Sequence, residues 1–228
     1  MATVPVGHAV GGGTRKAWVL KAGSVKNLRL QTLRQVERPG YGEVLIKVRC
    51  IGLNFADVFS VLGLYSATPR GEFVPGLEFS GVVAAVGASA SDGKTTVEFA
   101  SQEARERVER EASGFKPGDR VSGVVRFGAY STSILAPAHQ LRHIPKSWSF
   151  EQGAALNVQA LTSFYGLKEL GNVKPGQVVL VHSCAGGCGL VRQIDFTFQS
   201  VETLLFTSLH FNTKSFSSPP HCIDDTTN

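Results

Sequence analysis

Three glycines after a short apolar run are the residues of this 228-residue sequence that point first to chemistry. Residues 178–182 predict a buried strand, and Gly186, Gly187 and Gly189 lie at the turn that follows it. Because glycine has no Cβ, such a turn lets backbone N–H groups approach a pyrophosphate, whose charge a following helix N-terminus favours. Glycines also close ordinary turns, so the motif gains its weight from the strand before it.

A second element should complete a nucleotide site of this kind. An acidic residue about 20 residues beyond the glycine turn usually holds the adenosine ribose. Glu202 lies near that distance, but no strand pattern leads to it, so we expect Glu202 to be a surface carboxylate. Only residues 201–209 offer a short helix candidate after residue 190. We therefore expect an irregular tail over residues 191–228.

The composition favours a folded, mildly basic enzyme. Hydrophobic residues make up 43% of the chain and charged residues 18%, which is enough apolar content for a core and too little charge for a disordered chain. The net charge of +5 is scattered, with no basic run interleaved with aromatics, so no nucleic-acid partner is expected. No apolar stretch approaches the ~20 residues of a membrane span.

The cysteines indicate a reducing, cytoplasmic location. Their spacing suggests neither a disulfide framework nor a zinc pair. The four cysteines are Cys50, Cys184, Cys188 and Cys222. We therefore expect no metal, and small side chains tolerated at a tight turn account for Cys184 and Cys188.

Residues 16–150 show the pattern of a β-rich domain. Short runs rich in β-branched residues alternate with Gly and Pro turns, which is typical of a mostly antiparallel, barrel-like architecture. The runs lie within residues 16–48, 44–53, 75–87, 116–125 and 131–137. The glycine-containing residues 1–15 are expected to form a flexible leader.

Residues 97–113 predict a charged helix inserted between two of these strands. Glu103 with Arg107, and Glu106 with Arg110, have the i,i+4 spacing that supports a helix. A solvated surface helix is the favoured interpretation, and a partner-binding helix is the alternative.

The pattern changes to helical spacing after residue 149. Ser149 and Gln152 have the spacing of a capping box, and apolar residues follow at helical intervals up to Leu170. The sequence GNVKPGQ then predicts a turn before the strand at residues 178–182. This order opens an α/β unit, so we place a domain boundary near residues 147–152.

These motifs together resemble the medium-chain dehydrogenase/reductase family. The sequences GLNFADVFSVLGLY, PGLEFSGVVAAVG, KPGDRV, GAYSTSILAP and VVLVHSCAGGCGL occur in the family's order. They are most similar to its zinc-free quinone oxidoreductase branch, including the vesicle amine transport protein-like members. The resemblance implies an α+β chain: a GroES-like catalytic domain at residues 16–150, then the start of a truncated Rossmann domain at residues 151–190.

The positions of the family's zinc ligands carry other residues here. Zinc-dependent relatives have a Cys where this chain has Asn54, and a G-H-E motif where it has Gly76, Leu77 and Glu78. Neither Asn nor Leu replaces a thiolate or an imidazole at a catalytic zinc. The resemblance therefore implies a zinc-free site.

The resemblance also implies site residues and a cofactor. The cofactor would be NADPH, and the substrate a quinone or an electron-poor C=C. Asn54 and Tyr65 would be the catalytic residues, and the cofactor would contact Asn54, Thr162, Gly186, Gly187, Cys188 and Gly189. From the residues alone, Asn54 could instead be a turn residue and Tyr65 a half-buried ring. Asp57 is expected to be a structural hydrogen-bond acceptor.

The functional expectation follows from these parts. We expect an NADPH-dependent quinone or enone reductase that is weak or inactive in this chain, since most of the cofactor domain is missing. The alternative is a non-enzymatic binding or vesicle-trafficking module built on the GroES-like domain. An unfinished sheet around residues 178–181 would leave strand edges open, which predicts a homo-oligomer or another association.

Overall fold

The structure, a computed structural model, describes residues 13–35, 38–87, 101–182, 185–191 and 202–206. The chain divides into two compact units, residues 1–172 and residues 173–228. Helices join mainly antiparallel sheets in the first unit, and a small parallel sheet forms in the second. The α+β class expected from the sequence is confirmed. The domain boundary near residues 147–152 stays a prediction.

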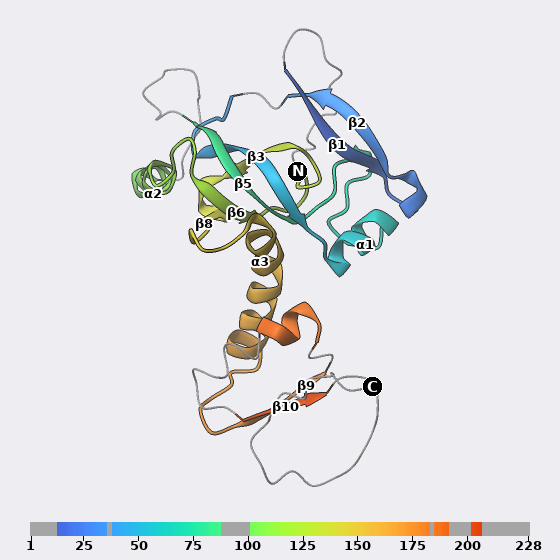
Figure 1. The fold of residues 1–228 in the computed structure, drawn as a ribbon, viewed down its shortest axis with the longest axis vertical. Coiled ribbons are helices and arrows are strands. Elements are labelled where there is room, and N and C mark those ends of the chain that lie inside the picture. Colours follow the sequence, from blue (N-terminus) through green and yellow to red (C-terminus); the bar gives the residue numbers. More distant parts are fainter. Residues whose placement is uncertain (1–12, 36–37, 88–100, 183–184, 192–201, 207–228) are drawn as a thin grey trace. The chain divides into compact units, whose positions relative to one another are not determined.

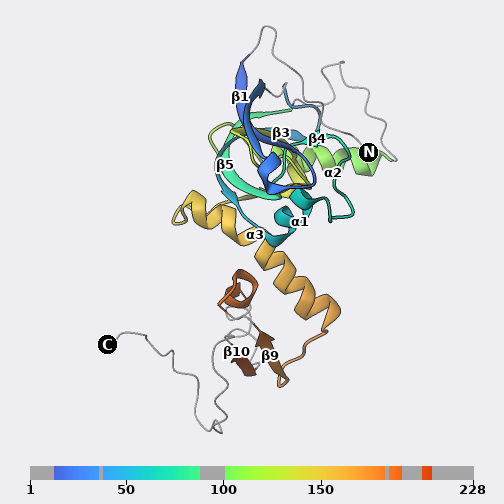
Figure 2. The same ribbon diagram turned by 90° about the vertical axis from the view of Figure 1, so that its right-hand side faces the viewer.

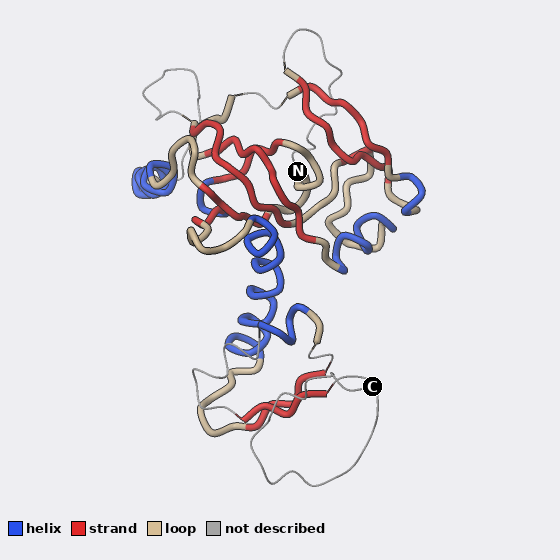
Figure 3. The backbone as a smooth tube through the Cα atoms, viewed as in Figure 1, coloured by secondary structure: helices blue, strands red, loops and turns tan. Residues whose placement is uncertain are grey.

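Two antiparallel sheets build the first unit (Figures 1 and 3). The three-stranded sheet has the order β2 (Arg29–Arg34), β1 (Thr14–Lys21), β4 (Glu72–Phe73). The five-stranded sheet has the order β7 (Ser133–Pro137), β3 (Glu43–Gly52), β5 (Glu78–Val86), β6 (Arg120–Val124), β8 (Leu141–His143). Short 3-10 turns lie at η1 (Val25–Asn27) and η3 (Ala138–Gln140). The β-rich architecture expected for this part of the chain is therefore present.

The core of the five-stranded sheet follows from alternation along its strands. In β3, Val44 and Ile46 are fully buried, whereas Lys47 between Ile46 and Val48 is exposed. Successive side chains of a strand point to opposite faces, so the apolar set gathers on one side. Phe79 of β5 and Val121 of β6 are buried in the same cluster. These side chains fix the register of β5, and so the position of the residue with which β5 begins.

Helix α2 (Gln102–Ser113) is the charged helix expected from the sequence, and it begins later than expected because Ser101 caps its first turn. Residues 88–100, including the expected first turns, lie outside the described residues. Its ion pairs include Arg105–Glu109 at 3.5 Å and Arg107–Glu111 at 3.0 Å, in which each arginine contacts the carboxylate four residues later.

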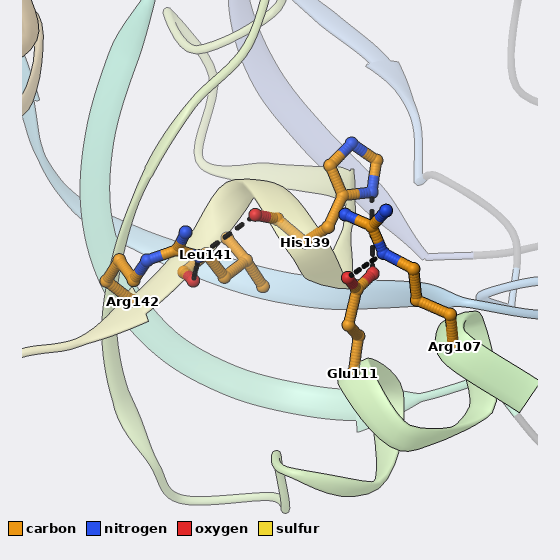
Figure 4. Close-up of polar contacts among 5 residues, drawn as sticks. All are labelled: Arg107, Glu111, His139, Leu141 and Arg142. Atoms are coloured by element: carbon orange, nitrogen blue, oxygen red, sulfur yellow. Dashed lines mark hydrogen bonds and ion pairs between the residues drawn. The ribbon is translucent and has the colours of Figure 1, made fainter.

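One side of α2 packs on the first unit itself. Ala112 is buried in the core of the five-stranded sheet, one turn after the partly buried Val108. Glu111 also faces His139 of η3, and its Oε2 lies 4.0 Å from Nδ1 of His139 (Figure 4). Arg142 donates to the carbonyl oxygen of His139 at 2.9 Å. The apolar side of α2 is thus used within the chain, which does not favour a partner-binding helix.

Two further helices frame the candidate site. Helix α1 (Phe55–Leu62) follows β3, and α3 (Phe150–Phe164) packs on β3, β5 and β6 before a π-helical segment, η4 (Tyr165–Leu170). The capping box is present: Ser149 Oγ accepts from the backbone N–H of Gln152 at 3.2 Å. Among the described residues, no helix is both long and apolar enough to cross a membrane.

The second unit contains two parallel strands. Strand β9 (Val178–His182) is where the sequence predicts it, and β10 (Glu202–Phe206) pairs with it in parallel, with Val178 opposite Glu202. The expectation of a helix at residues 201–209 is therefore wrong over residues 202–206, and the rest of that range lies outside the described residues. Strand β10 begins at Glu202, and the residues before it, where no strand was expected, also lie outside the described residues. Pairing with β9, a strand distant in sequence, gives this segment its strand conformation despite its weak local sequence pattern.

Strand β10 occupies one edge of β9, so the expectation of unpaired edges at residues 178–181 is wrong for that edge. Among the described residues, no strand pairs with the other edge of β9. Apart from residue 191 and β10, the expected irregular tail lies outside the described residues. Association through this sheet stays a prediction.

Candidate active site

Asn54 lies where the chain passes from β3 into α1. It is the N-cap residue of α1 in extended backbone conformation, and its own N–H donates to Asp57 Oδ2 at 2.8 Å. This bond is one half of a capping box, in which a carboxylate three residues into the helix holds the cap residue. Asp57 is therefore the structural acceptor that the sequence predicts. The capping geometry alone would also suit a simple turn residue at position 54.

The side chain of Asn54 has a second, long-range partner. Its Nδ2 donates to Glu78 Oε1 at 2.9 Å. Glu78 is the first residue of β5 and is fully buried. Its other oxygen, Oε2, accepts from the backbone N–H of Val158 in α3 at 2.8 Å. Glu78 therefore connects the start of α1 to the middle of α3 through the amide of Asn54.

Tyr130 closes the same network from the other side. Its hydroxyl makes a hydrogen bond with the carboxylate of Asp57, and both side chains are buried. The backbone N–H of Tyr130 donates to the carbonyl of Pro75 at 3.0 Å, next to Gly76. Gly76 has a φ of 98°, and a Cβ there would lie 2.7 Å from the backbone nitrogen of Tyr130. Glycine is thus required for Tyr130 to reach Asp57.

Burial controls the electrostatics of this network. It raises the pKa of Glu78, helped by the negative charge of Asp57, while the bonds from Val158 and Asn54 act in the opposite direction. Burial likewise raises the pKa of Asp57 against the bonds from Asn54 and Tyr130. Burial and the charge of Asp57 also raise the pKa of Tyr130, so the phenol stays a donor. The site is a pair of buried carboxylates held by hydrogen-bond donors.

Thr162 shares a helix with one end of the network. It lies four residues after Val158 in α3, so the two residues fall on the same helical face. Thr162 is exposed. Figure 2 shows that α3 changes direction partway along its length. A side chain that engages a helical N–H causes such bends, and the Glu78 carboxylate bound to Val158 N–H is of this type.

Tyr65 lies three residues after the end of α1, within an exposed apolar surface. Its ring is 39% exposed, compared with 78% for Phe55 and 68% for Leu64. Phe55 and Phe59 stand with their ring centroids 5.9 Å apart. Asn54 and Tyr65 thus flank one helix whose exposed face is aromatic, a surface chemically suited to a planar apolar ring.

The glycine turn of the second unit leads into a helix. Residues 187–191 are helical, and the N–H of Leu190 donates to the carbonyl of Gly186 at 2.9 Å. Gly186 is exposed, so its backbone is open to a ligand, and Cys188 is partly buried. Backbone N–H groups at such a turn fit a pyrophosphate. Gly187 and Gly189 belong to the same helical turn, while Cys184 lies outside the described residues.

Through Glu78, Asn54 is thus connected to α3, the helix that contains Thr162. Tyr65 lies beyond the end of α1, and the glycine turn belongs to the second unit. Within the described part of the chain, no cluster of three His, Cys, Asp or Glu residues could hold a metal ion. Sequence reasoning missed Glu78 and Tyr130 as members of the site. The available signal was a carboxylate at the start of an apolar run, since a buried charge needs partners.

The chain is similar to several known proteins. Residues 40–146 match the alcohol dehydrogenase GroES-like domain. The synaptic vesicle membrane protein VAT-1 homolog of Rattus norvegicus is 36% identical over 169 residues, which are 74% of this chain and 36% of that protein. The quinone oxidoreductase from Thermus thermophilus, solved alone and with NADPH, has a TM-score of 0.66 at 29% identity and covers 85% of this chain and 54% of its own.

A third similar structure, the CurK enoyl reductase, has a TM-score of 0.66 at 28% identity over 84% of this chain and 53% of its own. These similarities support the medium-chain dehydrogenase/reductase family, in its quinone oxidoreductase-like branch, as the family of this chain. It spans about a third of the VAT-1 homolog's length and about half of each solved chain.

Similarity to this oxidoreductase family locates the network within a known domain type. Asn54, Asp57, Glu78 and Tyr130 all fall inside the matched GroES-like region, residues 40–146. Val158 is the member of the network that lies beyond this region. The roles expected for Asn54, Tyr65, Thr162 and the glycine turn stay predictions.

Proposed function

We propose that this medium-chain dehydrogenase/reductase chain carries the catalytic half of an NADPH-dependent reductase of quinones or of electron-poor C=C bonds. The observation that carries the proposal is the similarity to a quinone oxidoreductase solved with NADPH, which covers 85% of this chain. NADPH, when bound, supplies the hydride. The residues of this chain bind the rings, orient them and stabilise developing charge.

Each proposed role rests on the geometry of one unit. Asn54, fixed by Asp57 and Glu78, contacts the nicotinamide end of the cofactor or the substrate. The exposed rings of α1 hold a planar substrate, with Tyr65 as a hydrogen-bond donor at its edge. Thr162 contacts the nicotinamide carboxamide. A preformed hydrogen-bonding site lowers the cost of reorganisation when the reaction occurs.

In the second unit, the backbone N–H groups of Gly186, Gly187, Cys188 and Gly189 hold the pyrophosphate in this proposal. The described part of that unit has two strands, so it offers few contacts to the adenosine half. A loss of ~4 kcal/mol of such contacts weakens binding nearly a thousandfold. We therefore expect the 228-residue chain alone to bind NADPH weakly and to turn over slowly.

A binding or trafficking module is not favoured as an alternative. Its expected contact surface was α2, whose apolar side packs on the first unit. The exposed face of α1 lies beside Asn54 and fits a substrate site as well as a partner site. No feature of the described residues favours the module over the reductase.

The proposal is tested by NADPH titration of the purified chain, followed by nicotinamide fluorescence, and by NADPH oxidation with a soluble quinone. Asn54→Ala should weaken binding and lower kcat/KM by about tenfold or more, since it removes contacts at the reacting ring. Asn27→Ala is the matched control, because Asn27 also donates one amide bond, to the carbonyl of Lys21 at 3.0 Å.

Binding at high micromolar NADPH that Asn54→Ala weakens and Asn27→Ala leaves unchanged would support the proposal. A chain that shows no saturable NADPH binding at millimolar concentrations would refute a cofactor role. Equal loss in both variants would show that Asn54 acts only through the stability of the fold.

A further inference from the structure

We infer that Glu78 is a positioning residue for Asn54, whose amide it holds in one orientation with the NH2 group turned into the protein. The effect of Glu78 on ligand binding rests on the proposed function, in which Asn54 contacts the cofactor or the substrate. Its structural part stands on the three hydrogen bonds that converge on Glu78 and Asn54.

The NH2 end of the Asn54 amide faces Glu78. An ionised carboxylate accepts hydrogen bonds and cannot donate them, so the amide nitrogen must be the atom at 2.9 Å from Oε1. The opposite rotation would place the amide oxygen against the carboxylate oxygen. Such a contact between two acceptors in a buried site is strongly unfavourable.

A backbone donor of α3 holds Glu78 in place. The Val158 N–H binds Oε2 at 2.8 Å, and it belongs to a helix packed on β3, β5 and β6. A backbone donor cannot rotate away, so one oxygen of Glu78 is committed to α3 and the other is left for Asn54. Gly52 is the last residue of β3, and a Cβ there would lie against the Glu78 carboxylate, which shows how closely the backbone encloses it.

The main chain of Asn54 is held by Asp57. Asp57 accepts its backbone N–H at 2.8 Å, and the capping box also sets the Asn54 side chain against the backbone N–H of Asp57. The titratable groups that act on Glu78 are Asp57 on α1 and Tyr130 after β6. The Glu78 carboxylate therefore contacts the side chain of Asn54, whereas the Asp57 carboxylate contacts its main chain.

A strict carboxylate requirement follows from this geometry. In Glu78→Gln, one amide oxygen faces two donors, the Val158 N–H and the Asn54 NH2. The fixed backbone donor keeps the oxygen, so the new NH2 group faces Asn54 and makes its amide rotate by half a turn. The variant has the same shape as the wild type but presents the other end of Asn54.

The test is 15N NMR of the wild-type chain between pH 4 and 8, with the Asn54 side-chain signal assigned by its loss in Asn54→Asp. We expect this signal to titrate together with Glu78, and to move to a new position and stop titrating with it in Glu78→Gln. The control Glu72→Gln makes the same change at an exposed residue of β4 and should leave the signal as in the wild type.

NADPH titration of the same samples gives the functional outcome. Glu78→Gln should bind about tenfold more weakly, as expected when one hydrogen bond to a ligand is lost. A wild-type Asn54 signal that ignores pH would overturn the inference without any variant, even if Glu78→Gln fails to fold. A changed signal with unchanged NADPH affinity would overturn the positioning role.

If the wild-type chain binds no NADPH while the Asn54 signal follows Glu78, the proposed function fails and the anchoring of Asn54 by Glu78 stands. The two failures are therefore distinguishable.

Discussion

Replacing Gly52 by Ala should break the connection between Asn54 and α3 without touching either. A Cβ at Gly52 would lie against the Glu78 carboxylate and 2.6 Å from the carbonyl oxygen of Ala154, and real Cβ contacts essentially never fall below 3.0 Å. Because the carbonyl belongs to α3, Glu78 must leave its position or the helix must move. Either change separates Glu78 from its two donors.

The cost can be worked from these contacts. Overpacking of this kind costs about 1–3 kcal/mol, and a hydrogen bond to a charged group contributes about 1.5–3 kcal/mol. With at least one of the two bonds lost, Gly52→Ala should lower the free energy of unfolding by about 2.5–6 kcal/mol, a large part of the 5–15 kcal/mol typical of a domain. At a urea m-value of about 1–3 kcal/mol/M, the midpoint should fall by about 1 M or more.

Urea unfolding followed by tryptophan fluorescence measures this effect in the relevant unit. Both tryptophans, Trp18 and Trp148, lie in the first unit. Gly71→Ala is the matched control, because a Cβ at Gly71 would meet no atom within 4 Å. The control should stay within about 0.5 kcal/mol of the wild type. A Gly52→Ala protein as stable as the control would refute the tight enclosure of Glu78.

Three further predictions concern the same unit. Tyr130→Phe should lower the free energy of unfolding by about 1–3 kcal/mol, because buried Asp57 loses a donor, and an unchanged melting temperature would contradict this bond. Burial raises the pKa of Glu78 above its ordinary 4.5, so the folded chain binds the Glu78 proton more tightly than the unfolded chain. The stability of the wild type relative to Glu78→Gln should therefore fall as the pH rises from about 4.5 through the raised pKa. Urea midpoints that move the opposite way would contradict a raised pKa of Glu78. Phe79→Ala should lower the free energy of unfolding, measured by chemical denaturation, by about 3–5 kcal/mol, since Phe79 is fully buried. Phe55→Ala should lower it by under about 1 kcal/mol, since Phe55 is 78% exposed. Similar losses in both variants would argue against the core described above.

The local patterns of the sequence predicted most elements of this fold. The capping box at Ser149, the strand at residues 178–182 and the turn chemistry before β6 are signals contained within a few residues. Strand β10 was missed because its stability depends on a parallel partner 24 residues away, which no local period reveals. The start of α2 moved to residue 102 because Ser101 offered a better cap than the residues before it.

The candidate site shows the same division. Asn54 and Asp57 are three residues apart, so their capping bond could be predicted from spacing, and the resemblance placed Asn54 in the site. The bond from Asn54 to Glu78 spans 24 residues, and that from Val158 to Glu78 spans 80. Contacts across such separations depend on the packing of three elements. They are therefore visible only once the fold is known.

The Asn54 network also bears on how the two units share the proposed reaction. Every bond that fixes Asn54 arises between residues 54 and 158, all within the first unit. The orientation of Asn54 is thus set before any cofactor binds and does not depend on the glycine turn. If cofactor affinity comes from the second unit and orientation of the reacting ring from the first, changes at Gly186 or Gly187 should alter NADPH affinity while the Asn54 amide signal stays the same. Changes at Glu78 should alter both.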